Sequence, residues 1–132
     1  MRNIGYYRVP EEIKSHHIHK RGAIAMAVQD QSDRPAELRH KNSSAYNFYI
    51  IQKGPLSDSY MDKLEKRYKI SIPEKKRKIY RKYGGNPHLD NQYTVFGEVY
   101  SGFKTIDKIS KVMVDAYDRP EKDIFLTVEI IG

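Results

Sequence analysis

Leu89 to Ile109 reads LDNQYTVFGEVYSGFKTIDKI, and this stretch shows the clearest structural pattern in the chain. Its middle part, Tyr93 to Tyr100, is rich in β-branched and aromatic residues, which predicts a strand. Gly97 within it predicts a bend or a bulge. From Phe103 to Met113 the apolar residues recur with the spacing of one face of an amphipathic helix. We therefore expect a strand followed closely by a helix.

Three further segments on either side predict strands. Gly22 to Val28 (GAIAMAV) is a short apolar run, and its length favours a buried strand over a helix, although periodicity alone does not decide. Asn47 to Gln52 (NFYIIQ) and Phe125 to Ile131 (FLTVEII) are rich in aromatic and β-branched residues. Residues 29–45 between the first two strands have no periodicity and predict a long loop.

The segment from residue 55 to residue 86 has a different character. Apolar residues at helical spacing predict one helix over Ser57 to Tyr68. Ser71-Ile72-Pro73-Glu74 has the pattern of a capping box and predicts the start of a second helix, which the Gly84-Gly85 pair should end. Ile79, Tyr80 and Tyr83 are the expected apolar contacts of this second helix. The sequence thus predicts a helical hairpin between strands.

This hairpin carries the charge of the protein. The formal net charge is +7, from 24 Lys and Arg against 17 Asp and Glu. Between Lys53 and Asn86 there are 11 basic and 4 acidic residues, a difference of +7, so the remaining residues balance. The tyrosines among these lysines would allow a nucleic-acid interface. We prefer the alternative that the lysines are the solvent-exposed faces of helices whose tyrosines pack on the strands, which makes nucleic acid an unlikely partner.

Composition excludes several classes of function. The sequence has no cysteine, which removes disulfides, Cys-ligated zinc and thiol catalysis. The sequence contains no run of about 18 apolar residues, so it predicts no membrane span. The first residues do not have the pattern of a secretory signal. The cytoplasm is the default location, with export left open because the N-terminus could be truncated.

Three histidines near the N-terminal end, His16, His17 and His19, raise the question of a metal site. No carboxylate or cysteine stands at a matching spacing, so we predict no metal ligands here. For His19 we prefer a structural role just before the first strand.

The motifs resemble those of the cyclophilin-type peptidyl-prolyl isomerases. GAIAMA, a loop and NSSAYNFYIIQ resemble the family's G-x-[LI]-[AS]-M-A strand followed by N-[ST]-x-x-S-Q-F-[FY]-I. Leu89 to Ile109 resembles LDG-x-x-[TV]-VFG-x-V-x-x-G-x-x-x-[VL]-[DE]-x-I. DAYDRPEKDIFLTVEII resembles the family's closing strand, and the likeness runs from about Gly5 to Ile131. The hairpin alone falls outside the common core.

The resemblance implies a fold that is mostly β with helices, a closed eight-stranded antiparallel barrel capped by two helices. We expect a single, incomplete domain over residues 1–132, with the N-terminal strands and the first helix missing and the hairpin as an insertion at 55–86. An incomplete barrel has unpaired strand edges and an exposed inner face, which predicts self-association.

The resemblance also implies a chemistry, rotation about X-Pro bonds in protein folding, with proline-containing segments as partners and without a metal or cofactor. The family uses an arginine in an F-H-R segment, followed by Q-G-G-D, to stabilise the twisted amide. Neither segment occurs in this sequence. We therefore expect no catalytic residue and weak or absent isomerase activity.

The same resemblance assigns six substrate-binding positions. Asn47 replaces a glutamine that reaches towards the substrate backbone, and Tyr49 stands for the aromatic at the floor of the proline pocket. The hydroxyl of Tyr49 needs a hydrogen-bond partner if it is buried. Tyr93 replaces a histidine, and His88 falls near the position of a tryptophan that some members use. Ala27 matches an alanine on the pocket rim, and Leu89 matches a pocket leucine. The alternative function is a non-catalytic module that binds proline-containing segments, or a partner through the basic hairpin.

Overall fold

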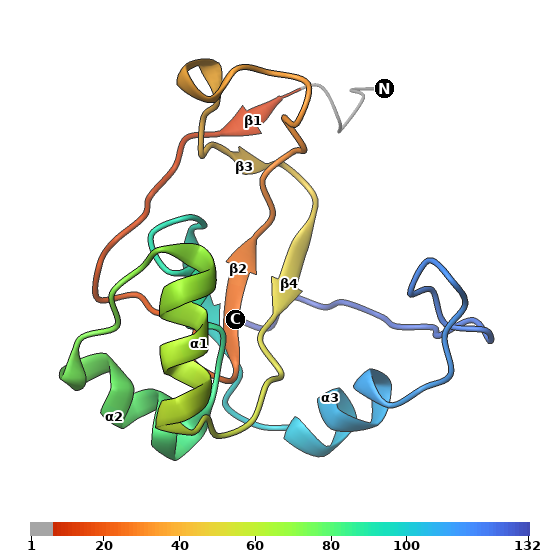
Figure 1. Cartoon of the computed structure of the whole chain (residues 1–132). Helices are drawn as coiled ribbons and strands as arrows, with labels where there is room; N and C mark the ends of the chain where they lie inside the picture. The colour runs from red at the N-terminus through yellow and green to blue at the C-terminus, as the bar shows by residue number, and fades with distance from the viewer. Residues whose placement is uncertain (1–6) are drawn as a thin grey trace. The chain divides into compact units, whose positions relative to one another are not determined.

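The computed structural model describes residues 7–132, which form two compact units divided after Ser101, residues 7–101 and 102–132 (Figure 1). Each unit is described by itself. The expectation of one domain over the whole chain stays a prediction.

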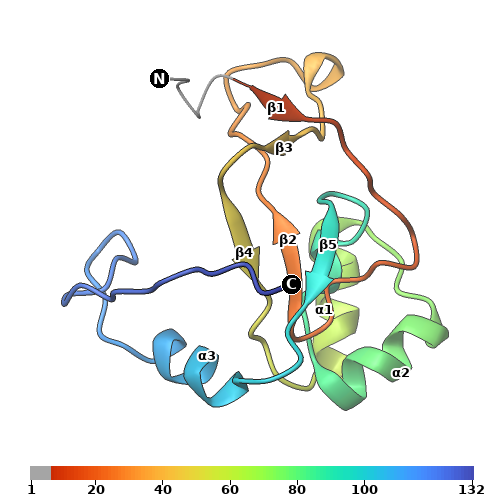
Figure 2. The same cartoon turned by 180° about the vertical axis from the view of Figure 1, so that it is seen from behind.

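A three-stranded antiparallel sheet lies at the centre of the first unit, in the order β4 (Phe48–Ile50), β2 (Ala23–Met26), β5 (Val95–Glu98) (Figure 2). β2 pairs with β4 through Ile24 with Ile50 and Met26 with Phe48. The register between β2 and β5 shifts after Ile24, opposite the stretch that contains Gly97, so the predicted bulge is confirmed. The three predicted strands in this unit are confirmed, each shorter than its apolar run.

A second, two-stranded sheet pairs β1 (Arg8–Val9) with β3 (Ser43–Ser44). The prediction of residues 29–45 as loop alone is therefore wrong in part, because this stretch contains β3 and a short 3-10 helix, η2 (Ala36–Leu38). Two-residue strands are too short to leave a periodic pattern in a sequence.

The helical hairpin is confirmed as α1 (Asp58–Tyr68) and α2 (Glu74–Tyr83). The side chain of Ser57 caps α1 by accepting a hydrogen bond from the backbone N–H of Tyr60 at 3.2 Å. The predicted capping box at Ser71 is wrong, because α2 begins later, with Pro73 in the capping position. Glu65 of α1 instead accepts the backbone N–H of Ile72 at 2.8 Å, so a side chain of the first helix fixes the entry to the second.

The two hairpin helices are held together by an ion-pair cluster on one side and an apolar core on the other. The Arg77 guanidinium of α2 lies 3.2 Å from Asp58, 2.7 Å from Asp62 and 2.5 Å from Glu65 of α1. The buried core under the hairpin consists of four residues, with Ile18 and Ile70 packed against it: Leu56, Met61, Ile72 and Tyr80. Ile18 lies in the segment that leads into β2, so the hairpin packs against this segment.

Two glycines let the end of α2 approach the rest of the unit. Gly84 has φ +88°, and a Cβ there would lie 2.1 Å from the carbonyl carbon of Gly54. Gly85 has φ +141°, and a Cβ there would lie 2.2 Å from the backbone oxygen of His19. Residues with a side chain rarely adopt these backbone φ values, so only glycine fits this junction without strain.

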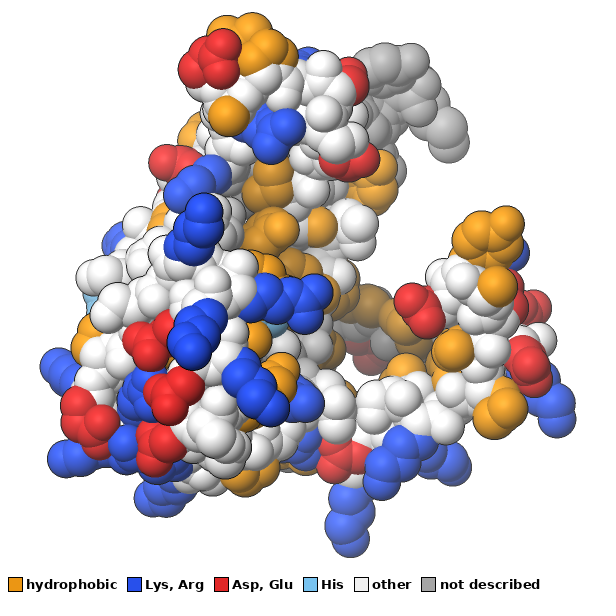
Figure 3. Space-filling view, viewed as in Figure 1, with side chains coloured by type: hydrophobic (Ala, Val, Ile, Leu, Met, Phe, Trp, Pro, Cys, Tyr) orange, Lys and Arg blue, Asp and Glu red, His pale blue; other side chains and the backbone are white. Residues whose placement is uncertain are grey.

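The described residues form two small antiparallel sheets, and no closed barrel is seen among them. The expected mixture of antiparallel strands and helices is confirmed, whereas the missing N-terminal part of the barrel stays a prediction. β4 and β5 end the three-stranded sheet, and their outer edges have no neighbouring strand among residues 7–132. Phe48 on β4 is 50% exposed and Phe96 on β5 is 59% exposed. Hydrophobic side chains gather over β2 and β4, whereas Lys and Arg mixed with Asp and Glu cover α1 and α2 (Figure 3).

The second unit contains α3 (Phe103–Ser110), which confirms the predicted helix with an end three residues earlier. The carboxylate of Asp115 then accepts backbone N–H groups of Tyr117 at 2.8 Å and Arg119 at 3.1 Å and organises a turn. The prediction of a strand over Phe125 to Ile131 is wrong, because no described residue pairs with this segment. A β-rich composition does not make a strand without a partner for its backbone groups.

Candidate functional site

One end of the three-stranded sheet brings predicted site residues together. Because the strands are antiparallel, β2 ends where β4 and β5 begin. The backbone N–H of Ala27, just after β2, donates to the carbonyl of Asn47 at 2.8 Å. The N–H of Met26 donates to the carbonyl of Thr94 at 3.0 Å, which places Tyr93 at the same end. Four of the six predicted positions therefore surround this end of the sheet: Ala27, Asn47, Tyr49 and Tyr93.

An aromatic cluster lies within this group. The rings of Tyr49 and Tyr93 are perpendicular, with centroids 5.8 Å apart. The imidazole of His19 lies 6.0 Å from the Tyr49 ring and 6.3 Å from the Tyr93 ring. Both tyrosines are half-buried, so part of each ring is still open to a ligand. Such edge-to-face pairs form an apolar wall whose hydroxyl ends need polar partners.

His19 supplies that partner for Tyr49. The imidazole is completely buried, its Nε2 lies 2.9 Å from the Tyr49 hydroxyl and its Nδ1 lies 3.0 Å from Asp90 Oδ1. The expectation that a buried Tyr49 hydroxyl would need a partner is thus met by a residue 30 positions away in the chain. Burial, together with the nearby Tyr93 and Asp90, raises the pKa of the Tyr49 hydroxyl, which keeps its proton.

Asp90 is the centre of the polar contacts behind this cluster. Its Oδ1 accepts the backbone N–H of His19 at 2.8 Å, and its Oδ2 accepts the hydroxyl of Tyr80 at 2.5 Å. Burial first, and then the negative charge of Asp90, raise the pKa of Tyr80, so this hydroxyl remains a donor. The side-chain amine of Lys76 lies 4.0 Å from Oδ2.

The two remaining predicted residues, His88 and Leu89, lie on the 3-10 helix η3 (Pro87–Leu89). The His88 ring stacks on Tyr68 of α1 with centroids 4.5 Å apart. Burial lowers the pKa of His88, and its Nδ1 is buried with no hydrogen-bond partner among the described residues. Leu89 is partly buried directly before Asp90.

A small pocket of about 120 Å³ lies beside Ala27 and Asn47. Arg8 also lines it, and its guanidinium donates to the side-chain oxygen of Gln29 at 2.8 Å. The sequence pattern did not single out Arg8. It reaches this pocket because β1 pairs with β3, only three residues before Asn47.

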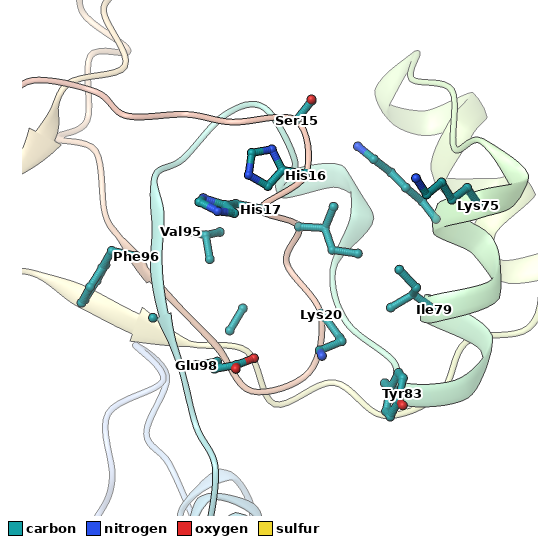
Figure 4. Close-up of a pocket in the computed structure, with 14 residues that line it drawn as sticks. Ser15, His16, His17, Lys20, Lys75, Ile79, Tyr83, Val95, Phe96 and Glu98 are labelled. Carbon is teal, nitrogen blue, oxygen red and sulfur yellow. The ribbon is translucent and has the colours of Figure 1, made fainter.

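A larger cavity lies elsewhere and is lined by none of the six predicted residues. It has a volume of about 790 Å³ and lies between the 15–20 segment, α2 and β5 (Figure 4). Ala23, Ile79 and Val95 contribute apolar surface, and Lys20 and Lys75 are among its basic residues. Glu98 is its one acidic residue within the described part of the chain.

The chain matches the cyclophilin type peptidyl-prolyl cis-trans isomerase/CLD family over residues 2–129. The chain belongs to the cyclophilin-type family. It is 33% identical over 93 residues to a Staphylococcus saprophyticus protein named as a peptidyl-prolyl cis-trans isomerase, covering 70% of this chain and 45% of that protein. A Staphylococcus haemolyticus protein of the same name is 31% identical over 85 residues, 64% of this chain and 41% of its own length.

A Streptococcus pyogenes protein named as a bifunctional phosphatase/peptidyl-prolyl cis-trans isomerase is 30% identical over 113 residues. That match covers 83% of this chain and 21% of the relative. This cyclophilin-type chain thus spans less than half the length of these relatives. Among residues 7–132 no helix is long and apolar enough to cross a membrane.

The histidines near the N-terminal end divide by environment in this cyclophilin-type chain. The ring centroids of His16 and His17 lie 4.2 Å apart, and both residues are exposed. His19, in contrast, is buried and has two side-chain partners. No group of three His, Cys, Asp or Glu side chains that could hold a metal ion occurs in the part of the chain that the structure describes. The structural role expected for His19 stays a prediction, which its burial and its two side-chain partners support.

Besides Arg8, two residues behind the aromatic cluster were not predicted as site residues from the sequence. Asp90 stands inside the LDN motif, next to the predicted Leu89, and a buried carboxylate at that place needs donors. Tyr80 was expected as an apolar contact, which is correct for its ring, but its hydroxyl is also the donor to Asp90. The only available signal was the rule that a buried tyrosine finds a hydrogen-bond partner.

Proposed function

We propose that this chain binds X-Pro segments at the end of the sheet where β2 finishes and β4 and β5 begin. The observation that supports this most directly is the perpendicular, half-buried pair of Tyr49 and Tyr93. Two aromatic faces at this angle offer an apolar surface to a proline ring. Asn47, two residues before Tyr49 on the same face of the chain, offers an amide that can bond a peptide backbone.

We also propose that this chain isomerises X-Pro bonds more slowly than a complete cyclophilin does. The barrier to rotation comes from amide resonance, and a catalyst must stabilise the twisted amide, in which the nitrogen lone pair has left conjugation. The chain has no F-H-R segment to supply a guanidinium for that nitrogen. Loss of one oriented donor costs on the order of a hundredfold or more in rate.

The first experiment is a nuclear magnetic resonance titration of the chain with a short X-Pro peptide, together with the same peptide carrying Ala in place of Pro. We expect the Pro peptide to shift the ring signals of Tyr49 and Tyr93, and the Ala peptide to shift them less. Tyr49→Ala should abolish binding. Tyr100→Ala is the matched control, because that ring is 88% exposed and lies outside the cluster.

Exchange spectroscopy on the same X-Pro peptide measures isomerisation. We expect turnover at least about a hundredfold below that of the Staphylococcus saprophyticus relative. Comparable turnover would refute the claim that the arginine segment matters. Absence of any shift at Tyr49 and Tyr93 would refute the binding site.

A second candidate function is a non-catalytic module that binds a partner through the basic hairpin. The larger cavity favours it, because Lys20 and Lys75 both line it together with apolar residues such as Ile79. A short acidic peptide should bind the chain, Lys75→Glu should weaken that binding, and Lys63→Glu on α1 should not. If both lysine variants behave alike, the cavity is not the binding surface.

Nucleic acid is the less favoured partner for the hairpin. Stacking of bases needs accessible aromatic faces. Tyr80 is buried, and Tyr68, although 41% exposed, already stacks one face on His88. Tyr60 and Tyr83 are the other exposed tyrosines of the hairpin. We expect no salt-sensitive binding of a single-stranded oligonucleotide in a fluorescence anisotropy titration.

A further inference from the structure

Both helices of the hairpin contact the segment that carries predicted site residues. The Tyr80 hydroxyl of α2 donates to Asp90 Oδ2 at 2.5 Å, and the Tyr68 ring of α1 stacks on His88 at 4.5 Å. Asp90 and His88 lie on either side of Leu89. Helix α1 therefore contacts the residue before Leu89, and helix α2 contacts the residue after it.

The contact through Tyr80 continues as far as Tyr49. Asp90 accepts from Tyr80 with one carboxylate oxygen, and its other oxygen lies 3.0 Å from His19 Nδ1. His19 Nε2 lies 2.9 Å from the Tyr49 hydroxyl. Three hydrogen bonds thus connect the second hairpin helix, through Asp90 and His19, to the aromatic residue at the proposed proline site.

The donor and acceptor roles in this series follow from the groups themselves. A carboxylate only accepts, so Nδ1 of a neutral His19 carries the proton and donates to Asp90. In an imidazole that carries its single proton on Nδ1, Nε2 is an acceptor, and the Tyr49 hydroxyl donates to it. The raised pKa values of Tyr49 and Tyr80 agree with two hydroxyls that keep their protons. The Tyr49 hydroxyl hydrogen is therefore oriented towards His19.

Burial makes this series specific. His19 and Tyr80 are completely buried and the Asp90 side chain is 8% exposed, so bulk water has little access to the middle of the series. Polar groups in such surroundings lose much if a partner is removed, and hydrogen-bonded neighbours polarise one another. A change at Tyr80 should therefore alter the hydrogen bonding of His19 and, through it, that of Tyr49.

We propose that Tyr80 of the hairpin is a positioning residue for Tyr49, acting through Asp90 and His19. The inference rests on the proposed X-Pro site for its functional meaning. It gives the inserted hairpin a role in shaping that site, in addition to the charge that the hairpin displays on its surface.

The test uses Tyr80→Phe, which keeps the buried ring and removes only the hydroxyl. Tyr60→Phe on α1 is the matched control, since Tyr60 belongs to the same hairpin but lies outside the series. In the free protein, Tyr80→Phe should shift the ring signals of Tyr49 and Tyr60→Phe should leave them in place. Unchanged Tyr49 signals in Tyr80→Phe would overturn the proposal, whatever any peptide does. If Tyr80→Phe does not fold, Tyr49→Phe should shift the ring signals of Tyr80, and their constancy would overturn it equally.

Affinity for an X-Pro peptide separates positioning from general destabilisation. We expect Tyr80→Phe to weaken binding about three- to tenfold in the otherwise unchanged chain. In a Tyr49→Phe background the same change should have no further effect, because the hydroxyl that it positions is absent. If the two losses multiply instead, Tyr80 does not act through Tyr49 and the proposal fails. If the unchanged chain binds no X-Pro peptide, the proposed function fails, and the Tyr49 ring shifts alone decide the coupling.

Discussion

Gly84 and Gly54 are in close contact at the base of the helical hairpin. We expect Gly84→Ala to destabilise the fold much more than Gly54→Ala. In Gly84→Ala the new Cβ would lie 2.1 Å from both the carbonyl carbon and the oxygen of Gly54 and 2.4 Å from the oxygen of Lys53. All three are backbone atoms, which cannot rotate away. The φ of +88° at Gly84 adds strain of its own.

We estimate the cost of Gly84→Ala from these two terms. A side chain at this φ costs about 1 to 3 kcal/mol, and forced backbone movement in a packed region costs a further 1 to 3 kcal/mol or so. At about 4 °C per kcal/mol for a chain of this size, the total of about 2 to 6 kcal/mol corresponds to a drop in the unfolding midpoint of roughly 8 to 24 °C.

Gly54→Ala is the matched control from the other side of the same contact. A Cβ at Gly54 has no heavy atom within 4 Å, so we expect a change in the free energy of unfolding of about 0.5 kcal/mol or less. Thermal unfolding followed by circular dichroism measures both variants. Equal midpoints for the two variants would refute the reasoning that the close approach at Gly84 holds the hairpin in place.

Three further predictions concern the core, the ion pairs and the open sheet. Met61→Ala should lower the free energy of unfolding by about 2 to 5 kcal/mol in urea titrations, because the side chain is completely buried in the hairpin core; a loss below about 1 kcal/mol would contradict that packing. Hydrogen bonds from Arg81 lower the pKa values of Asp58 and Glu74 from ordinary values of 3.8 and 4.5, so their stabilisation is present above those values and lost as the pH falls below them. The midpoint temperature of unfolding should therefore decrease as the pH is lowered from about 5 to about 2. Arg81→Met should make this decrease with pH smaller; an equal decrease in that variant would exclude these ion pairs as its cause. Phe48→Lys combined with Phe96→Lys should reduce self-association in analytical ultracentrifugation, since both side chains are exposed beside unpaired strand edges; an unchanged mass distribution would count against this surface.

Much of the local structure could be predicted from sequence. The strands around Ile24, Tyr49 and Phe96 were predictable because β-branched and aromatic residues favour a pleated, half-buried surface. The hairpin was predictable because helix periodicity and a glycine stop mark its limits. The start of α2 was placed wrongly, since Ser71 resembles a cap but the helix begins after Pro73. The strand predicted over residues 125–131 failed because pairing depends on a neighbour that no local pattern specifies.

By itself the sequence determined the family motifs, the positions of three strands and three helices, and the concentration of positive charge in one segment. Each of these depends on residues close together in the chain. Only the tertiary structure decided that His19 meets Asp90, 71 positions away, and that Tyr80 and Tyr49 bond the two ends of that pair. Such contacts depend on how the sheet register and the Gly84-Gly85 junction bring distant segments together, and no local propensity encodes that geometry.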